Sequence, residues 1–194
     1  MRPRVAGGLL AALLAATALQ ATAHGGADTQ RLPVVGRAPE FALTTHAGDP
    51  LALSDLRDKV LAVTFIYATC RDSCPVLAAK MVGLQRRLGP DFGPRVRFVA
   101  ITVDPETDTP QVLASYARAI GADRKGWSFL TGSPEAIRRV VSEYGGFARR
   151  AGAGVEHLYI TSLVDRAGLM RVQYLGHRFD PEEMLRDLRS LARE

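Results

Sequence analysis

The sequence is poor in cysteine: it has two in 194 residues, Cys70 and Cys74, and they lie close together in the chain. It therefore lacks the widely spaced pairs that crosslink distant loops in small exported domains, and a bond between these two would restrict the unfolded chain very little. The charge is nearly balanced, with 25 Lys and Arg against 20 Asp and Glu, and no basic stripe is interleaved with aromatic residues. These absences argue against nucleic acid as a partner and against a disulfide-stapled scaffold.

The composition, 47% hydrophobic and 23% charged, is typical of a globular domain. The N-terminus differs, because Arg2 and Arg4 precede an uncharged Leu/Ala-rich run, and Ala21-Thr22-Ala23 has the small-x-small pattern of a signal-peptidase site. We expect residues 1–23 to be a signal peptide. The alternative is an uncleaved anchor, since roughly 17–25 apolar residues can span a bilayer. Either interpretation places the folded part in the periplasm or at the outer face of the cytoplasmic membrane.

After a polar, flexible lead-in over residues 24–38, residues 39–194 are expected to form one domain. Apolar β-branched runs predict buried strands at residues 60–67 and 96–103. Turn signals and apolar spacing predict the remaining elements: a hairpin of residues 41–44 and 51–53, helices from residues 74, 109, 133 and 181, a loop over residues 145–154, and strands at residues 157–164 and 169–175. This order fits an α/β, thioredoxin-like fold with a central mixed β-sheet, flanking helices and an N-terminal β-hairpin, although several α+β sheets would also fit it.

The two cysteines flank the start of a predicted helix, directly after a predicted strand, and Pro75 suits the first helical position. A helix N-terminus favours the thiolate, so we expect a lowered cysteine pKa, with Arg71 acting in the same direction and Asp72 opposing it. In a helical turn, side chains at i and i+4 lie on one face, close enough to form a disulfide or to hold one metal ion. Two thiolates and one imidazole suit soft Cu(I), whereas structural Zn(II) needs four protein ligands. The plainer alternative is a pair of buried small hydrophobes or an incidental disulfide.

Three segments resemble the Sco/SenC family of copper-binding cytochrome c oxidase assembly proteins. Thr64 to Met81 reads TFIYATCRDSCPVLAAKM and resembles the family's metal-binding segment; Ile101 to Thr109, ITVDPETDT, resembles its acidic turn. Glu156 to Gly168, EHLYITSLVDRAG, resembles the segment that carries the family's ligand histidine. The matches occur in the family's order across most of residues 39–194.

The resemblance implies a thioredoxin-like fold and one copper ion per chain, Cu(I) or Cu(II), held by Cys70, Cys74 and His157. It also implies a metallochaperone, not an enzyme, that delivers copper to the binuclear copper site of cytochrome c oxidase or to another copper protein, close to a membrane. Family members usually carry Pro after the first cysteine, where this chain has Arg71. That departure leaves the ligands intact and puts the rigidity of the loop and the choice of partner in question.

A second hypothesis is a thiol-disulfide oxidoreductase, in which Cys70 and Cys74 reduce partner disulfides without metal. Three residues separate the cysteines, where redox enzymes of this fold usually have two, so the spacing favours the metal. Among the other polar residues, Asp108 fits a cap of the following helix, and Asp104 faces the metal site by resemblance alone. The remaining histidines are expected to be solvated or in a disordered tail: His24, His46 and His177.

Overall fold

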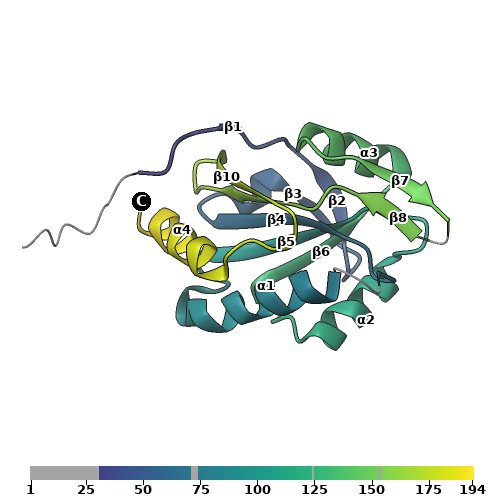
Figure 1. Cartoon of the computed structure of the whole chain (residues 1–194), viewed down its shortest axis with the longest axis horizontal. Helices are drawn as coiled ribbons and strands as arrows, with labels where there is room; N and C mark the ends of the chain where they lie inside the picture. The colour runs from purple at the N-terminus through teal and green to yellow at the C-terminus, as the bar shows by residue number, and fades with distance from the viewer. Residues whose placement is uncertain (1–30, 71–73, 124, 153) are drawn as a thin grey trace, which may run out of the picture.

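The computed structural model describes residues 31–70, 74–123, 125–152 and 154–194 (Figure 1). The predicted signal peptide, His24 and Arg71 lie outside these residues. None of the helices in the described part of the chain is long and apolar enough to cross a bilayer.

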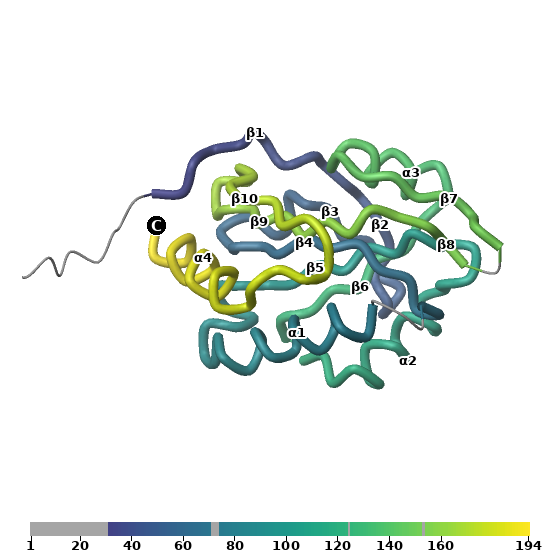
Figure 2. Tube along the Cα trace, viewed as in Figure 1, coloured from purple at the N-terminus to yellow at the C-terminus, as the bar shows by residue number. Residues whose placement is uncertain are grey.

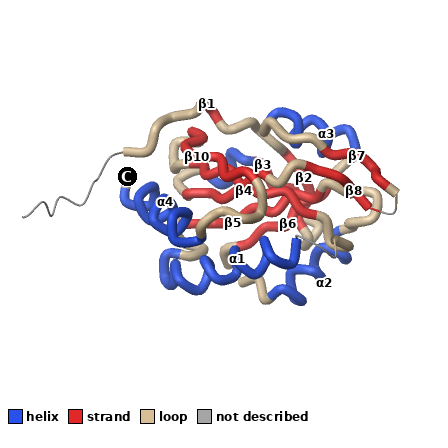
Figure 3. Tube along the Cα trace, in the orientation of Figure 1, coloured by secondary structure: helices blue, strands red, loops and turns tan. Residues whose placement is uncertain are grey.

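An eight-stranded mixed sheet forms the centre of the domain, in the order β1-β10-β9-β4-β5-β6-β2-β3 (Figure 3). The central strands β4, β5 and β6 are parallel, and the flanking pairs are antiparallel. The strands are β1 (Gly36–Arg37), β2 (Ala42–Thr45), β3 (Pro50–Ala52), β4 (Val60–Ile66), β5 (Val96–Thr102), β6 (Trp127–Thr131), β9 (Ile160–Val164) and β10 (Leu169–Leu175). A separate two-stranded sheet pairs β7 (Ala148–Ala151) with β8 (Gly154–His157).

Helices cover both faces of the sheet, which explains why the central strands are apolar without alternation. Helices α1 (Cys74–Leu88), α2 (Pro110–Ile120) and α4 (Pro181–Arg193) lie on one face, and α3 (Pro134–Glu143) lies on the other (Figure 1). Successive side chains of β4 point in opposite directions, so Ala62 joins the core under α1, whereas Val63 joins the core under α3. The strand that leads to the cysteines is therefore buried from both sides.

Helices α2, α3 and α4 each begin with proline, directly after an N-cap whose side chain accepts a backbone N–H. The N-caps are Thr109, Ser133 and Asp180. Proline fits this place because the first N–H of a helix has no partner within the helix. The helix starts predicted from the sequence are confirmed here, as are the N-terminal hairpin and the mixed α/β sheet.

Two predicted segments differ in the structure. Residues 145–154 are not a loop, because β7 occupies Ala148–Ala151 and pairs with β8. His157 does not begin a strand of the main sheet; it ends β8, and β9 starts separately at Ile160. Strand β6, which pairs with β5 and β2, has no counterpart among the sequence predictions. In the hairpin of β7 and β8, apolar and polar residues alternate only weakly, and glycine and arginine are frequent. Its sequence therefore resembles that of a loop.

The described end of the lead-in is attached to the domain. Gly36–Arg37 pairs with β10, and the buried Arg171 donates to the carbonyl oxygens of Leu32 and Pro33. The same guanidinium binds Asp165 at 2.9 Å and Glu194 at 2.8 Å, so one buried cation joins both ends of the domain (Figure 2).

Replacing Arg171 with methionine should lower the free energy of unfolding by about 3 kcal/mol, because Asp165 would keep a buried charge without its partner. This value is the lower end of the usual cost of breaking a buried ion pair, because the second partner, Glu194, is partly exposed. Urea denaturation at pH 7 measures the change. The matched control is Arg138→Met, which breaks an exposed pair with Glu135 and should cost less than about 0.5 kcal/mol. Equal effects of the two variants would contradict the role of Arg171.

Candidate metal centre

The two cysteines lie where β4 ends and α1 begins. Cys74 is the first residue of α1, and both side chains are buried, with 8% of Cys70 and 1% of Cys74 exposed. Both are thiols, not joined in a disulfide, and they are hydrogen-bonded to each other. The structure thus brings together the pair that the sequence singled out.

Tyr67, one residue beyond β4, holds both sulfurs. Its backbone N–H donates to the sulfur of Cys74, and its carbonyl oxygen accepts the N–H of Cys70 at 3.3 Å. Its side chain is also hydrogen-bonded to Cys70. Burial raises the pKa of Tyr67 to about 12, and the bond to Cys70 adds to the rise, as expected when the phenol is the donor. Nothing in the sequence singles out Tyr67, which there is only the last residue of an apolar run.

Burial raises the pKa of Cys74 to about 12, with the hydrogen bond to Cys70 acting in the same direction. The expectation that the helix N-terminus lowers the pKa of this cysteine was therefore wrong for Cys74 in the metal-free protein. Desolvation of the thiolate destabilises it more than the helix N-terminus stabilises it, because the helix dipole is equivalent to only about half a charge.

His157 ends β8 with its ring buried; 6% of the residue is exposed. Neither ring nitrogen has a hydrogen-bond partner in the described part of the chain. Burial lowers the pKa of His157 to about 4, although the backbone of Leu158, which approaches the ring without hydrogen-bonding geometry, opposes the shift. The imidazole is consequently neutral at physiological pH, the form in which histidine binds metals. The neighbouring Glu156 points outward and binds Arg149 at 2.6 Å, so it is not a partner of the ring.

Two tyrosine rings enclose His157. The ring of Tyr67 meets it edge-on at 5.7 Å between centroids, and that of Tyr159 lies at 4.2 Å. Tyr67 therefore contacts all three residues predicted as copper ligands. Within the described residues, however, no three His, Cys, Asp or Glu side chains are close enough to hold a metal ion. The structure brings the thiols together, and His157 is in contact with the ring of Tyr67 but does not form a three-ligand group with them.

The donor chemistry fits copper. Two sulfurs and an imidazole are soft to intermediate metal ligands. All three residues are buried, and the imidazole nitrogens make no hydrogen bond within the described residues. Buried polar nitrogens rarely lack a hydrogen-bond partner, so the two ring nitrogens of His157 need an explanation, and binding of a metal ion by one of them is such an explanation. The residues present are suited to holding Cu(I) once the imidazole and the thiols meet.

Asp108 is fully buried behind the cysteine loop and does not cap α2, which corrects the interpretation from the sequence; Thr109 is the cap. One oxygen of Asp108 accepts the N–H of Ala68 at 2.9 Å and the hydroxyl of Thr102 at 2.6 Å. The other oxygen has no hydrogen-bond partner among the described residues. Asp108 thereby attaches the segment between β4 and the cysteines to the end of β5. Burial raises the pKa of this carboxyl, and the charge of Asp104 adds to the rise.

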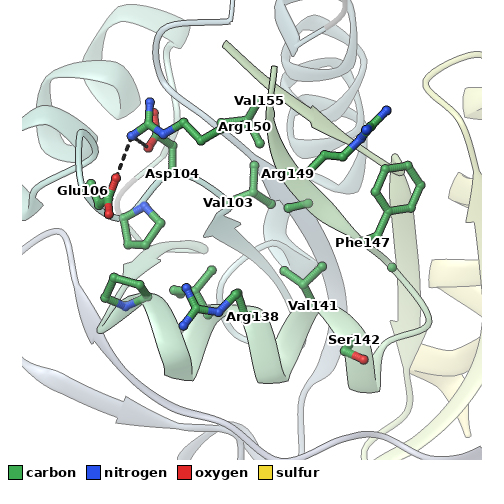
Figure 4. A pocket seen from close by; sticks show the side chains of 15 residues that line it. Val103, Asp104, Glu106, Arg138, Val141, Ser142, Phe147, Arg149, Arg150 and Val155 are labelled. Carbon is green, nitrogen blue, oxygen red and sulfur yellow. Dashed lines mark hydrogen bonds and ion pairs between the residues drawn. The ribbon is translucent and has the colours of Figure 1, made fainter. Parts of the chain in front are cut away.

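Asp104 connects the end of β5 to the hairpin that carries His157. Arg150 of β7 donates to Asp104 at 2.9 Å and to Glu106 at 2.8 Å. These residues form one side of a cavity of about 460 Å³ between α3 and the hairpin (Figure 4). Val103, Val141 and Val155 line its interior, and neither the cysteines nor His157 border it.

The two described histidines elsewhere are not simply solvated. His46 meets the ring of Phe129 edge-on at 5.6 Å. His177 contacts Tyr159 at the same centroid distance, and Lys80 of α1 donates to the carbonyl oxygen of His177 at 2.9 Å. Both belong to packed turns, and neither adjoins the thiols in the contacts described.

A family model described as SCO1/SenC matches residues 31–193. The curated relatives share about a third of the aligned residues, and the match spans 45–48% of their length. The chain thus covers about half of those proteins.

Three solved structures have the same fold. A SCO1/SenC family lipoprotein from Bacillus anthracis is 28% identical, with a TM-score of 0.74 over 81% of this chain and 95% of that one. ScoI from Bradyrhizobium japonicum, solved with copper bound, is 27% identical, with a TM-score of 0.70 over 80% and 99%. BsSco, described as a member of the Sco family of cytochrome c oxidase assembly proteins with a disulfide switch, is 25% identical, with a TM-score of 0.74 over 84% and 98%.

The burial of Asp108 predicts a pH effect on stability. Because its pKa is raised on folding, the folded protein binds the proton more tightly than the unfolded chain. Its contribution is most favourable below the ordinary carboxyl pKa and is lost progressively as the pH rises through the raised value. Asp108→Asn removes the charge, so the stability of the variant relative to the parent should increase from pH 4 to pH 8, measured by urea denaturation. The exposed Asp49→Asn is the control, and a parallel pH profile for Asp108→Asn would refute the assignment.

Proposed function

The chain belongs to the SCO1/SenC family, and we propose that it is a copper-binding protein that carries one copper ion on Cys70, Cys74 and His157. We also propose that the protein delivers this ion to the copper-accepting subunit of cytochrome c oxidase, outside the cytoplasm. A copper-bound ScoI, a Sco protein described as an oxidase assembly protein and a lipoprotein of the family support these three parts.

The observation that carries the proposal is the burial of two thiols and one unpaired imidazole around a single tyrosine. A structural role would leave the nitrogens of His157 hydrogen-bonded, because unpaired buried polar groups are costly. A ligand role accounts for them, since copper would occupy one nitrogen. The proton of Cys74 leaves for solvent when its sulfur binds the ion, because the thiolate is the ligand.

The hairpin of β7 and β8 gives His157 a way to reach the thiols. The hairpin pairs only with itself and lies outside the eight-stranded sheet, so it can shift without breaking a ladder bond of that sheet. Its described ion pairs to the loop after β5 run through Arg150, which is half-exposed. The pair of Arg150 with the exposed Glu106 contributes little. A displacement of the hairpin has to keep Arg150 close to Asp104, because a buried carboxylate without its partner is costly.

Release of copper follows from the small number of ligands. Two thiolates and Cu(I) carry one net negative charge, and three protein ligands leave the ion open to an incoming thiolate of the recipient. Transfer then proceeds by replacement of one sulfur at a time, with both proteins bound to the ion in between. This exchange involves no change in the oxidation state of the copper and no turnover, so the protein acts as a carrier.

A second function, reduction of partner disulfides, is favoured by the hydrogen bond between the two thiols. Cys70 would attack one partner sulfur and release the other as a thiolate. Cys74 would then displace the first partner sulfur, leaving a Cys70–Cys74 disulfide and a partner reduced by two electrons. This chemistry uses the same sulfurs and does not need His157.

Reduced protein titrated anaerobically with Cu(I) against a chromogenic chelator should bind one equivalent. His157→Ala should weaken binding at least about 100-fold, because loss of a surrounding hydrogen-bonding residue alone typically costs 10–100-fold and a ligand costs more. The reduction potential of the cysteine pair should change little. His46→Ala, which alters a packed histidine at another turn, is the matched control. Unaltered copper affinity in His157→Ala would exclude the three-ligand site.

The two functions separate in an assay without metal. As a carrier, the protein should turn over a mixed-disulfide substrate at a rate no higher than a small free dithiol of the same concentration. Burial of Cys74 and its raised pKa slow the resolving step, because the thiolate is the attacking form. Stopped-flow measurement with a Cys74→Ser control checks this rate. Rapid multiple turnover by the parent would instead establish the reductase.

A further inference from the structure

Tyr67 contacts each part of the site that copper would have to join. Its phenol is hydrogen-bonded to Cys70, and its ring is T-shaped to that of His157. Its backbone N–H donates to the sulfur of Cys74, and its carbonyl oxygen accepts the backbone N–H of Cys70. The residue is therefore in contact with each of the three ligands of the proposed function.

The phenol also reaches the hairpin. A side-chain carbon built on Gly154 would lie 3.5 Å from the hydroxyl oxygen of Tyr67, which is ordinary van der Waals contact. Gly154 is the first residue of β8 and His157 is the last, so one side chain spans the space from the cysteine loop to the strand of the histidine. The hairpin and the first turn of α1 lie at the same end of the main sheet (Figure 2).

Resting on the proposed function, we propose that Tyr67 is a positioning residue that holds Cys70 in the metal-free protein and is displaced when copper joins Cys70 to His157. An ion bound to both residues has to meet both of them, and the Tyr67 side chain already contacts both, with its hydroxyl at Cys70 and its ring at His157. The hydroxyl must give up its bond to Cys70 for the ring to leave. The bond therefore stabilises the metal-free dithiol against both of its alternatives, the copper complex and the disulfide.

This role has two consequences, one for the redox state of the cysteines and one for the affinity for copper. A hydrogen bond to the sulfur of Cys70 is available in the dithiol and is weakened once that sulfur enters a disulfide, so it favours the reduced form that can accept copper. The same bond competes with copper and so lowers affinity, which helps the ion leave for a recipient. The tyrosine hydroxyl adjusts both equilibria without being a ligand.

Tyr67→Phe tests the inference, because it keeps the ring against His157 and removes only the hydroxyl. Loss of one hydrogen bond should raise the affinity for Cu(I) three- to tenfold, measured by anaerobic competition with a chromogenic chelator. In metal-free protein, equilibration with a dithiol buffer should show the disulfide favoured by a similar factor. For a two-electron couple this is a potential lower by about 15–30 mV.

Tyr116→Phe is the matched control. The hydroxyl of Tyr116 is also buried, and it has no hydrogen-bond partner among the described residues. The phenol lies near the same cysteines, whose charges help to raise its pKa. Its removal should leave both the copper affinity and the potential unchanged. Urea denaturation of the two variants establishes that each is folded, and a purely structural role of Tyr67 would change stability alone.

The inference is overturned if Tyr67→Phe matches Tyr116→Phe in both copper affinity and potential. Failure of the parent protein to bind Cu(I) is a different result, because it refutes the proposed function. The metal-free potential then still tests the bond between Tyr67 and Cys70. Shifts of both quantities in the expected directions, with an unaltered control, support the inference.

Discussion

Exclusion of water from a small group of donors is the constraint around which this domain is organised. Burial raises the pKa of Cys74 and lowers that of His157, so a thiol and an imidazole are both neutral, and both are in contact with Tyr67. Neutral donors can be kept from water at moderate cost, whereas a buried thiolate or imidazolium would need a partner charge. In the proposed function, copper supplies that charge when it replaces the proton of a thiol.

The rest of the fold keeps this donor group in place. Strand β4 is enclosed between two cores, and its end is fixed through Ala68 and Thr102 to the buried carboxylate of Asp108. The hairpin of His157 lies outside the main sheet and is attached through the buried Val155 and through the pair of Arg150 with the buried Asp104. The sulfurs are therefore held by the main sheet and the histidine by a separate two-stranded unit.

Membership of the SCO1/SenC family and the geometry lead to the same interpretation from different directions. A ScoI solved with copper bound and a Sco protein described as an oxidase assembly protein support the proposed copper carrier. The geometry adds a tyrosine hydroxyl that is hydrogen-bonded to the first cysteine. In the role proposed for Tyr67, this one hydrogen bond balances the carrying of copper against the reduction of disulfides.

The sequence alone determined what local patterns specify. Apolar runs marked β4 and β5, and proline after a capping residue marked three helix starts. The cysteine spacing at a strand-to-helix junction marked the thiols. Tertiary structure decided what depends on contacts between distant segments. It paired a polar, glycine-rich stretch into the hairpin of His157. It also placed Asp108 where its carboxylate accepts the N–H of Ala68, so that Asp108 does not cap a helix. It also reversed the expected pKa of Cys74, because burial on folding outweighs the local field of a helix end, and no local pattern in the chain records how much water a side chain will lose.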